Sequence, residues 1–208
     1  MNLISVIICA YTEARWDDLA AAVASVRAQA LPAETIVVID HNDQLLRRAR
    51  ERFADATVIA NDGPRGLSGA RNSGVAAAAG ELIAFLDDDA RAAPDWLERL
   101  AAAYADPQAL GAGGAILPRW PAGRPRWFPA EFDWVVGCTY AGMPASPAPV
   151  RNLIGCNMSF RREVFALIGG FRIGRVGALS IGQENDETEL CIRLGMARPA
   201  ARLMYLPA

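Results

Sequence analysis

The sequence contains no lysine, and all 21 of its basic residues are therefore arginine. Without lysine the chain can have neither the lysine of a Walker-type phosphate loop nor a lysine Schiff base. It has one histidine, His41, so the paired histidines of an HExxH zinc site are excluded as well. Chemistry that depends on lysine or on histidine pairs is thereby ruled out.

Cysteines and long apolar runs are also few. The four cysteines, Cys9, Cys138, Cys156 and Cys191, have no CxxC spacing, and we expect them to be reduced and mostly in the core. The apolar stretch NLISVIICA is too short to span a membrane as a helix and follows no basic leader, so it predicts a buried strand. Both features favour a cytoplasmic protein, either free or at the inner face of the membrane.

Size and charge narrow the class of protein further. With 208 residues, of which 52% are hydrophobic, the chain can bury the core of one large domain. Its net charge of -2 gives no general attraction to nucleic acid, and no nucleic-acid partner is expected.

Short apolar runs alternate with amphipathic or alanine-rich stretches in the first half of the chain. This pattern predicts a Rossmann-like α/β fold with a doubly wound, mostly parallel sheet and helices on both faces. The expected strands are residues 4–9, 35–39, 56–59 and 82–86, and the expected helices are residues 17–30, 44–53, 69–79 and 94–104.

A polar segment follows each of three expected strands. These segments are AYTEA after residues 4–9, Asp40 with HND after residues 35–39, and the triplet Asp87, Asp88 and Asp89 after residues 82–86. In open sheets of this kind ligands bind beyond the carboxyl ends of the strands, so these residues should meet at one edge. Three adjacent carboxylates repel one another unless a positive group lies among them. The sequence therefore predicts a site for a positive partner at this edge.

The second half of the chain is organised differently. Residues 118–149 are rich in proline and tryptophan, which is typical of a long ordered loop. NLIGCNMSF predicts a strand, and the residues from Arg161 to the Gly169–Gly170 pair predict a helix. ENDETELCIRLG predicts a further helix ending at Gly195, and ARLMYLP a last strand. No internal repeat or low-complexity linker is present, so a single domain is expected.

Five segments, in this order, resemble the motifs of the family 2 glycosyltransferases, which have the glycosyltransferase A fold. They are SVIICAYTEA, VVID, RGLSGARNSGVAAAAGELIAFLDDDARAAPDWL, GCNMSFRREVFALIGGF and DETELCIRL, and together they cover nearly the whole chain. The resemblance implies a nucleotide-diphospho-sugar donor, Mg²⁺ or Mn²⁺, and transfer with inversion. It also implies that residues 1–105 bind the donor and residues 106–208 face the acceptor.

The aspartate triplet would hold the cation. A hard cation is commonly bound by one or two carboxylates together with phosphate oxygens. By resemblance, Asp89 is the direct metal ligand, with Asp87 a second metal candidate, and Asp87 and Asp88 lie closer to the ribose and to metal-bound water. The structural alternative is a solvated acidic turn.

The donor nucleotide would lie against Ala10 and Tyr11, with Asp40 accepting a hydrogen bond from a base N–H and Glu13 a weaker candidate. A UDP-sugar is the expected donor. Asp40 could instead be a turn or helix-capping residue, and His41 is assigned no catalytic role.

Arg71 and Asn72 are expected in the first turns of a helix that has Ser68 as its N-cap. The guanidinium of Arg71 could contact the base or a phosphate, or could pair with a nearby aspartate and shape the site.

The stretch RWPAGRPRWFPAEFDW interleaves arginine with aromatic residues. It could stack sugar rings, with Trp134 as a candidate, dock a lipid-linked acceptor or contact a membrane surface peripherally. Its aromatic residues could equally fill a satellite core. Asn157 is a candidate to hydrogen-bond the sugar.

Inversion requires a carboxylate that takes the proton from the attacking hydroxyl. In the stretch GQENDETELC the family resemblance gives Glu187 as the first choice, with Asp186 and Glu184 as alternatives. The alternative is that these acids only favour the amino end of a helix.

The resulting hypothesis is a metal-dependent, inverting glycosyltransferase that acts on a glycan or lipid-linked acceptor, as in the synthesis of cell-envelope polysaccharides. A nucleotide-sugar-binding module without turnover and a nucleotidyl-transfer domain are the alternatives. Relatives typically continue to a histidine that completes the metal site, so we expect this chain to be truncated at its C-terminus.

Overall fold

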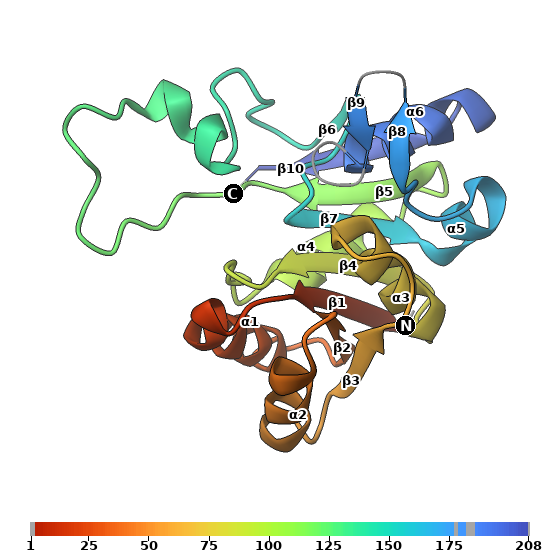
Figure 1. The fold of residues 1–208 in the computed structure, drawn as a ribbon. Helices are drawn as coiled ribbons and strands as arrows, with labels where there is room; N and C mark the ends of the chain where they lie inside the picture. The colour runs from red at the N-terminus through yellow and green to blue at the C-terminus, as the bar shows by residue number, and fades with distance from the viewer. Residues whose placement is uncertain (1–2, 177–178, 182–185, 208) are drawn as a thin grey trace.

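A computed structural model of the chain describes residues 3–176, 179–181 and 186–207, and its centre is an eight-stranded sheet (Figure 1). The strands lie in the order β3-β2-β1-β4-β7-β5-β10-β6. Their bounds are Ile4–Ala10 (β1), Ala33–Asp40 (β2), Thr57–Asn61 (β3), Leu82–Asp87 (β4), Ala109–Gly114 (β5), Ala148–Val150 (β6), Asn157–Arg161 (β7) and Arg202–Leu206 (β10). Gly174–Val176 (β8) and Leu179–Ile181 (β9) form a separate two-stranded antiparallel sheet.

Most of the sheet is parallel. Strands β3, β2, β1 and β4 are parallel to one another, and β5 and β10 run in the same direction. Strand β7 is antiparallel to β4 and β5, and β6 is antiparallel to β10. The predicted α/β fold with a mostly parallel sheet is therefore confirmed.

Helices cover both faces of the sheet, as expected for a doubly wound fold. Their buried residues divide into two hydrophobic clusters, one on each face. One face carries α1 (Trp16–Arg27), α2 (Asp43–Arg52) and α4 (Trp96–Ala103), and the other carries α3 (Leu67–Ala77), α5 (Arg162–Ile168) and α6 (Asp186–Ala197). Two 3₁₀ helices are also present, η1 (Glu13–Arg15), which leads directly into α1, and η2 (Ala130–Val136).

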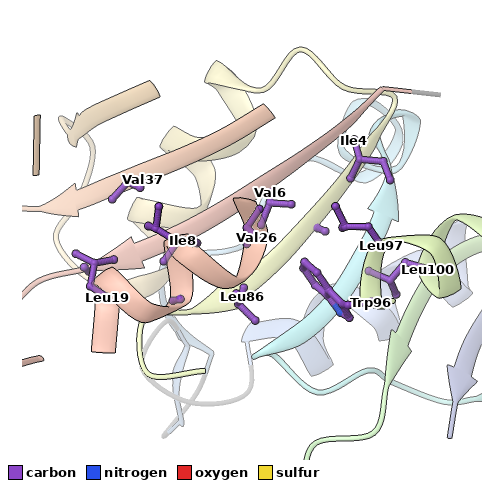
Figure 2. Packing of buried hydrophobic residues seen from close by; sticks show 14 of the residues in the cluster. Ile4, Val6, Ile8, Leu19, Val26, Val37, Leu86, Trp96, Leu97 and Leu100 are labelled. Atoms are coloured by element: carbon purple, nitrogen blue, oxygen red, sulfur yellow. The ribbon is translucent and has the colours of Figure 1, made fainter. Parts of the chain in front are cut away.

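The core is built from strands that are apolar on both faces. In β1, Val6 and Ile8 point to the face of α1 and α4, whereas Ile7 points to the opposite face, because side chains alternate along a strand. Figure 2 shows Val6 and Ile8 beside Val26 of α1, with Leu97 of α4 at the other end of the same cluster. This packing fixes the carboxyl ends of β1, β2 and β4 relative to one another.

The eight strands and helices predicted in the first half are all present, with ends shifted by a few residues. The expected N-cap of α3 is wrong: the cap is Gly66, whose φ of 119° favours glycine, and Ser68 lies inside the first turn. The predicted loop after β5 is largely irregular but contains η2 and β6.

Strand β5, with the sequence ALGAGG, has no counterpart among the predicted elements. Glycine is required here by close neighbours: a Cβ added at Gly113 would lie 2.4 Å from the carbonyl oxygen of Asn157. Glycine is poor in strands when no such approach requires it, so the pattern did not indicate one.

None of the described helices is long and apolar enough to cross a membrane. The four cysteines are free thiols, with Cys138 and Cys191 buried and Cys9 and Cys156 partly buried. This agrees with the expectation that they are reduced.

Candidate active site

A cavity of about 580 Å³ opens at the carboxyl ends of β1, β2 and β4. Six residues that the sequence assigned to the nucleotide or the metal line it together: Ala10, Tyr11, Asp40, Asp87, Asp88 and Asp89. The predicted convergence of polar strand ends is thus what the structure shows. Glu13 and Arg71 are not among the lining residues.

The positive groups that lie among the three aspartates are two arginines. Arg15 Nη2 is 3.2 Å from Asp88 Oδ1, and Arg15 Nη1 is 3.3 Å from Asp89 Oδ2. Arg71 Nη2 is 3.5 Å from Asp87 Oδ1. Arg15 was not predicted from the sequence, although it lies in the same segment after β1 as Tyr11.

The aspartates differ in their surroundings. The side chain of Asp88 is 4% exposed and that of Asp89 is 54% exposed. Burial raises the pKa of Asp88 to about 7, although Arg15 opposes the shift. Burial also raises the pKa of Asp87, against the effect of Arg71. Asp89, the predicted metal ligand, is the most accessible of the three.

These carboxylates could hold a divalent cation only together with oxygen ligands from a bound substrate. In the part of the chain that the structure describes, no three His, Cys, Asp or Glu side chains are placed to enclose a metal ion. Mg²⁺ is, however, often held by one or two carboxylates together with the phosphate oxygens of a substrate. Asp88 Oδ2 is buried without a hydrogen-bond partner among the described residues, which marks the triplet as a place where a ligand completes the bonding.

Asp40, at the end of β2, is held by three donors. Its Oδ1 accepts from Asn61 Nδ2 at 2.6 Å and lies 2.9 Å from His41 Nδ1, and its Oδ2 accepts from the Gly66 N–H at 3.0 Å. Burial raises the pKa of Asp40, but the hydrogen bonds outweigh it and the pKa lies below its usual value. Asp40 therefore presents to the cavity an ionised carboxylate whose orientation is fixed by hydrogen bonds.

Asn61, at the end of β3, was missed by the sequence analysis. Besides Asp40 it bonds the Pro64 carbonyl, the Gly63 N–H and the Ser73 hydroxyl, so it ties three segments together. Its position directly after an apolar run is the same signal that found Asp40.

Arg71 connects the cavity to the second half of the chain. Its buried guanidinium donates to Asp186 Oδ1 at 2.7 Å and to the Gly155 carbonyl at 3.2 Å, in addition to its contact with Asp87. The Ser68 hydroxyl donates to Asp186 Oδ2 at 2.9 Å. Of the two roles considered for Arg71, the structure shows pairing with nearby aspartates.

Glu187 follows Asp186 in the first turn of α6 but is not used in this pairing. Burial and a hydrogen bond shared with Asp186 raise the pKa of Glu187 to about 7, against the effect of Arg71. The two carboxylates thus differ, because Asp186 is the partner of Arg71 and Ser68 whereas Glu187 carries no ion pair among the described residues. Glu184, the third candidate, lies outside the described residues.

Two predicted sugar or acceptor residues have other surroundings. Asn157 Oδ1 accepts from the Trp96 indole at 2.8 Å and its Nδ2 donates to the Ala115 carbonyl, so its amide joins β7 to α4. Trp134 lies in η2, is 56% exposed and does not line the cavity. Contacts of either residue with a sugar stay predictions.

A doubly wound sheet with an acidic cavity at its carboxyl edge is the arrangement of the glycosyltransferase A fold. The sequence model of glycosyl transferase family 2 matches residues 5–169. The chain belongs to this family.

Named relatives agree with this assignment. The chain is 37% identical over 198 residues to the glucosyl-dolichyl phosphate glucuronosyltransferase of Haloferax volcanii, covering 92% of this chain and 63% of that protein. It is 29% identical over 122 residues to the succinoglycan biosynthesis protein ExoM of Rhizobium meliloti, covering 58% of this chain and 36% of the relative. The chain thus spans less than two thirds of the length of these relatives.

Solved structures confirm the fold. The mannosyltransferase PcManGT from Pyrobaculum calidifontis, determined in complex with GDP-Man and Mn²⁺, matches with a TM-score of 0.70 at 22% identity, over 99% of this chain and 55% of that one. S. aureus TarS 1-349 matches with a TM-score of 0.65 at 17% identity, over 98% of this chain and 58% of that one.

Proposed function

We propose that the protein transfers a sugar, with inversion, from a UDP-sugar to a lipid-linked acceptor, using Mg²⁺ or Mn²⁺. The observation that carries this proposal is the chain of contacts Asp87–Arg71–Asp186, which joins the carboxylate cavity to the helix that holds Glu187. In this proposal residues 1–105 bind the donor and residues 106–208 face the acceptor. Family membership and the neighbour solved with GDP-Man and Mn²⁺ support the use of a nucleotide sugar and a divalent cation.

The hydrogen bonds of Asp40 favour uridine as the base. A carboxylate offers about four lone-pair positions, and three are taken by Asn61, His41 and Gly66. One position on Oδ2 is left, which matches the single ring N–H of uracil. Guanine presents a ring N–H and an amino group side by side and would need two. Tyr11 at the rim of the cavity supplies an aromatic surface beside the base.

Asp89 and Asp87 would hold the cation together with the donor diphosphate. When bound, the cation stabilises as a Lewis acid the negative charge that grows on the departing diphosphate. Arg71 would hold Asp87 in position, because the guanidinium of Arg71 is buried and is itself fixed by hydrogen bonds to Asp186 and Gly155.

Glu187 is the proposed general base. A base must be free to accept the proton of the acceptor hydroxyl, and its pKa should lie near the working pH. Asp186 is committed to Arg71 and Ser68, whereas the pKa of Glu187 is raised to about 7. The acceptor oxygen bonds to the anomeric carbon as the sugar–phosphate bond breaks, the hydroxyl proton passes to Glu187, and the nucleoside diphosphate leaves on the donor side.

A lipid-linked acceptor is supported by the name of the Haloferax volcanii relative, which identifies a glucosyl-dolichyl phosphate as its substrate. The ExoM relative supports the second candidate, a growing polysaccharide. Acting on a lipid-linked acceptor would bring the protein to the cytoplasmic face of a membrane.

Binding and transfer assays test the proposal together. Thermal denaturation with UDP, GDP and their sugars, each with and without Mn²⁺, should show the largest stabilisation with UDP ligands and Mn²⁺. Transfer from a labelled UDP-sugar to polyprenyl-phosphate-linked sugars should then give a glycolipid. Binding without transfer or donor hydrolysis would leave only a nucleotide-sugar-binding module, and a failure to bind any nucleotide sugar would favour a nucleotidyl-transfer domain.

Replacing Asp89 by alanine should abolish the Mn²⁺-dependent part of UDP affinity. Because this side chain is mostly exposed at a turn, the fold should be unaffected. Titration calorimetry with Mn²⁺ and after chelation gives the two affinities, and Asp55→Ala, which removes another exposed carboxylate, is the control. Equal UDP affinity of the wild-type chain with and without the metal would contradict this role.

Replacing Asp40 by asparagine should weaken UMP, UDP and UDP-sugars by the same factor, about tenfold or more. The substitution removes a charged acceptor, and a hydrogen bond to a charged group contributes about 1.5–3 kcal/mol. Calorimetry of the three ligands, with thermal denaturation to monitor folding, measures the effect. A loss confined to one sugar would place Asp40 at the sugar instead of the base.

A further inference from the structure

Two polar atoms of the cavity wall are buried and have no hydrogen-bond partner in the described part of the chain, namely Arg15 Nε and Asp88 Oδ2. Both belong to one ion pair, since Arg15 Nη2 is 3.2 Å from Asp88 Oδ1. Leaving a buried polar group unsatisfied is unfavourable, and native proteins have few such groups. Their coincidence in one pair, on the wall of a ligand-sized cavity, indicates groups that a ligand satisfies.

The remaining contacts of Arg15 are weak. Its Nη1 is 3.3 Å from Asp89 Oδ2, but that carboxylate is mostly exposed, and exposed ion pairs contribute little to stability. Its guanidinium carbon lies 5.0 Å from the centre of the Tyr11 ring, which is itself exposed. Arg15 ends the short helix η1, none of whose residues is buried as a whole, and a third of the Arg15 side chain is exposed. The guanidinium can therefore leave Asp89 at small cost.

We propose that Arg15 binds the diphosphate of the donor and that, until the donor arrives, it occupies Asp89 in place of the divalent cation. The inference rests on the proposed function, because it requires a donor with a diphosphate. On binding, the guanidinium gives up Asp89 to the cation and turns its Nε and Nη1 donors to phosphate oxygens, while Nη2 stays with Asp88. Arginine suits this role because its planar fork of donors matches a phosphate.

The proposal predicts effects of opposite sign on two ligands. Without phosphate, Arg15 and the cation compete for Asp89 and repel each other. With phosphate present, Arg15 binds the anion and no longer competes. A residue that only supported the shape of the site would affect both ligands in the same direction.

The test compares Arg15→Ala and Arg15→Lys with Arg27→Ala. Arg27 is the last residue of α1, pairs with the exposed Asp55 and lies outside the cavity lining, so it is a control for the loss of one positive charge. Binding of Mn²⁺ alone is followed by electron paramagnetic resonance. Binding of UDP, GDP and uridine at saturating Mn²⁺ is followed by calorimetry.

Arg15→Ala should bind Mn²⁺ alone about threefold more tightly or better. It should bind UDP about tenfold more weakly or worse, with no change for uridine, which lacks phosphate. Arg15→Lys should bind Mn²⁺ like the wild type and regain part of the UDP affinity, and Arg27→Ala should change neither.

Unchanged UDP affinity in Arg15→Ala, or a parallel loss of Mn²⁺ and UDP, would overturn the role of Arg15 and leave the proposed function standing. A wild-type chain that binds neither UDP nor GDP in the presence of Mn²⁺ would overturn the proposed function and this role with it. The two failures are thus distinguishable.

Discussion

Replacing Glu187 by glutamine should reduce sugar transfer by about a hundredfold or more while leaving UDP and Mn²⁺ affinity unchanged, because general-base catalysis contributes on that scale. Glutamine keeps the shape of the side chain but cannot accept the proton of the acceptor hydroxyl. Single-turnover transfer and calorimetry measure the two quantities. If this variant transferred sugar at the wild-type rate while Asp186→Asn was inactive, the base would be Asp186.

The pH dependence gives a second check on Glu187. The base must be ionised, so the wild-type rate should rise about tenfold per pH unit below its pKa of about 7 and level off above it. The glutamine variant should lose this rise. The pH dependence of the free energy of unfolding is a matched control. Because the pKa of Glu187 is raised in the folded chain, ionisation of this side chain lowers the free energy of unfolding as the pH rises through about 7. The glutamine variant should therefore be no less stable than the wild type at pH 8.

Replacing Arg71 by methionine should lower the free energy of unfolding by about 3–5 kcal/mol, because it leaves the buried Asp186 without its counter-ion. This is a large share of the roughly 5–15 kcal/mol that stabilises a typical domain. Guanidinium chloride unfolding followed by circular dichroism measures the loss.

The double variant Arg71→Met/Asp186→Asn should recover at least half of that stability. Removing both charges avoids the unpaired carboxylate, and the asparagine side chain can still accept from Ser68. Strict additivity of the two single substitutions would show that Arg71 and Asp186 are not coupled, contrary to their 2.7 Å contact.

The sequence predicted the alternating strands and helices well, because buried parallel strands are short runs of branched apolar residues with polar strand ends. Those ends supplied Asp40 and the aspartate triplet. Asn61 ends β3 in the same way and could have been found by the same rule.

Arg15 could not be singled out from 21 arginines, because only the packed structure shows which of them faces a carboxylate. The sequence also could not show which of Asp186 and Glu187 pairs with an arginine, because two adjacent acidic residues look alike in sequence. Their roles separate only where Arg71 and Ser68 contact one of them.

The sheet order also determines when the site can be assembled during folding. Strand β7 pairs with β4, and Asp186 meets Arg71 across 115 residues of chain. Such distant pairings form late, because closing long loops costs entropy before the contacts repay it. Strands β1 to β4 can therefore come together while Arg71 has Asp87 beside it but not yet Asp186. Arrival of α6 then gives Arg71 its closer counter-ion and brings in Glu187, the proposed base, so completion of the fold would also complete the proposed catalytic site.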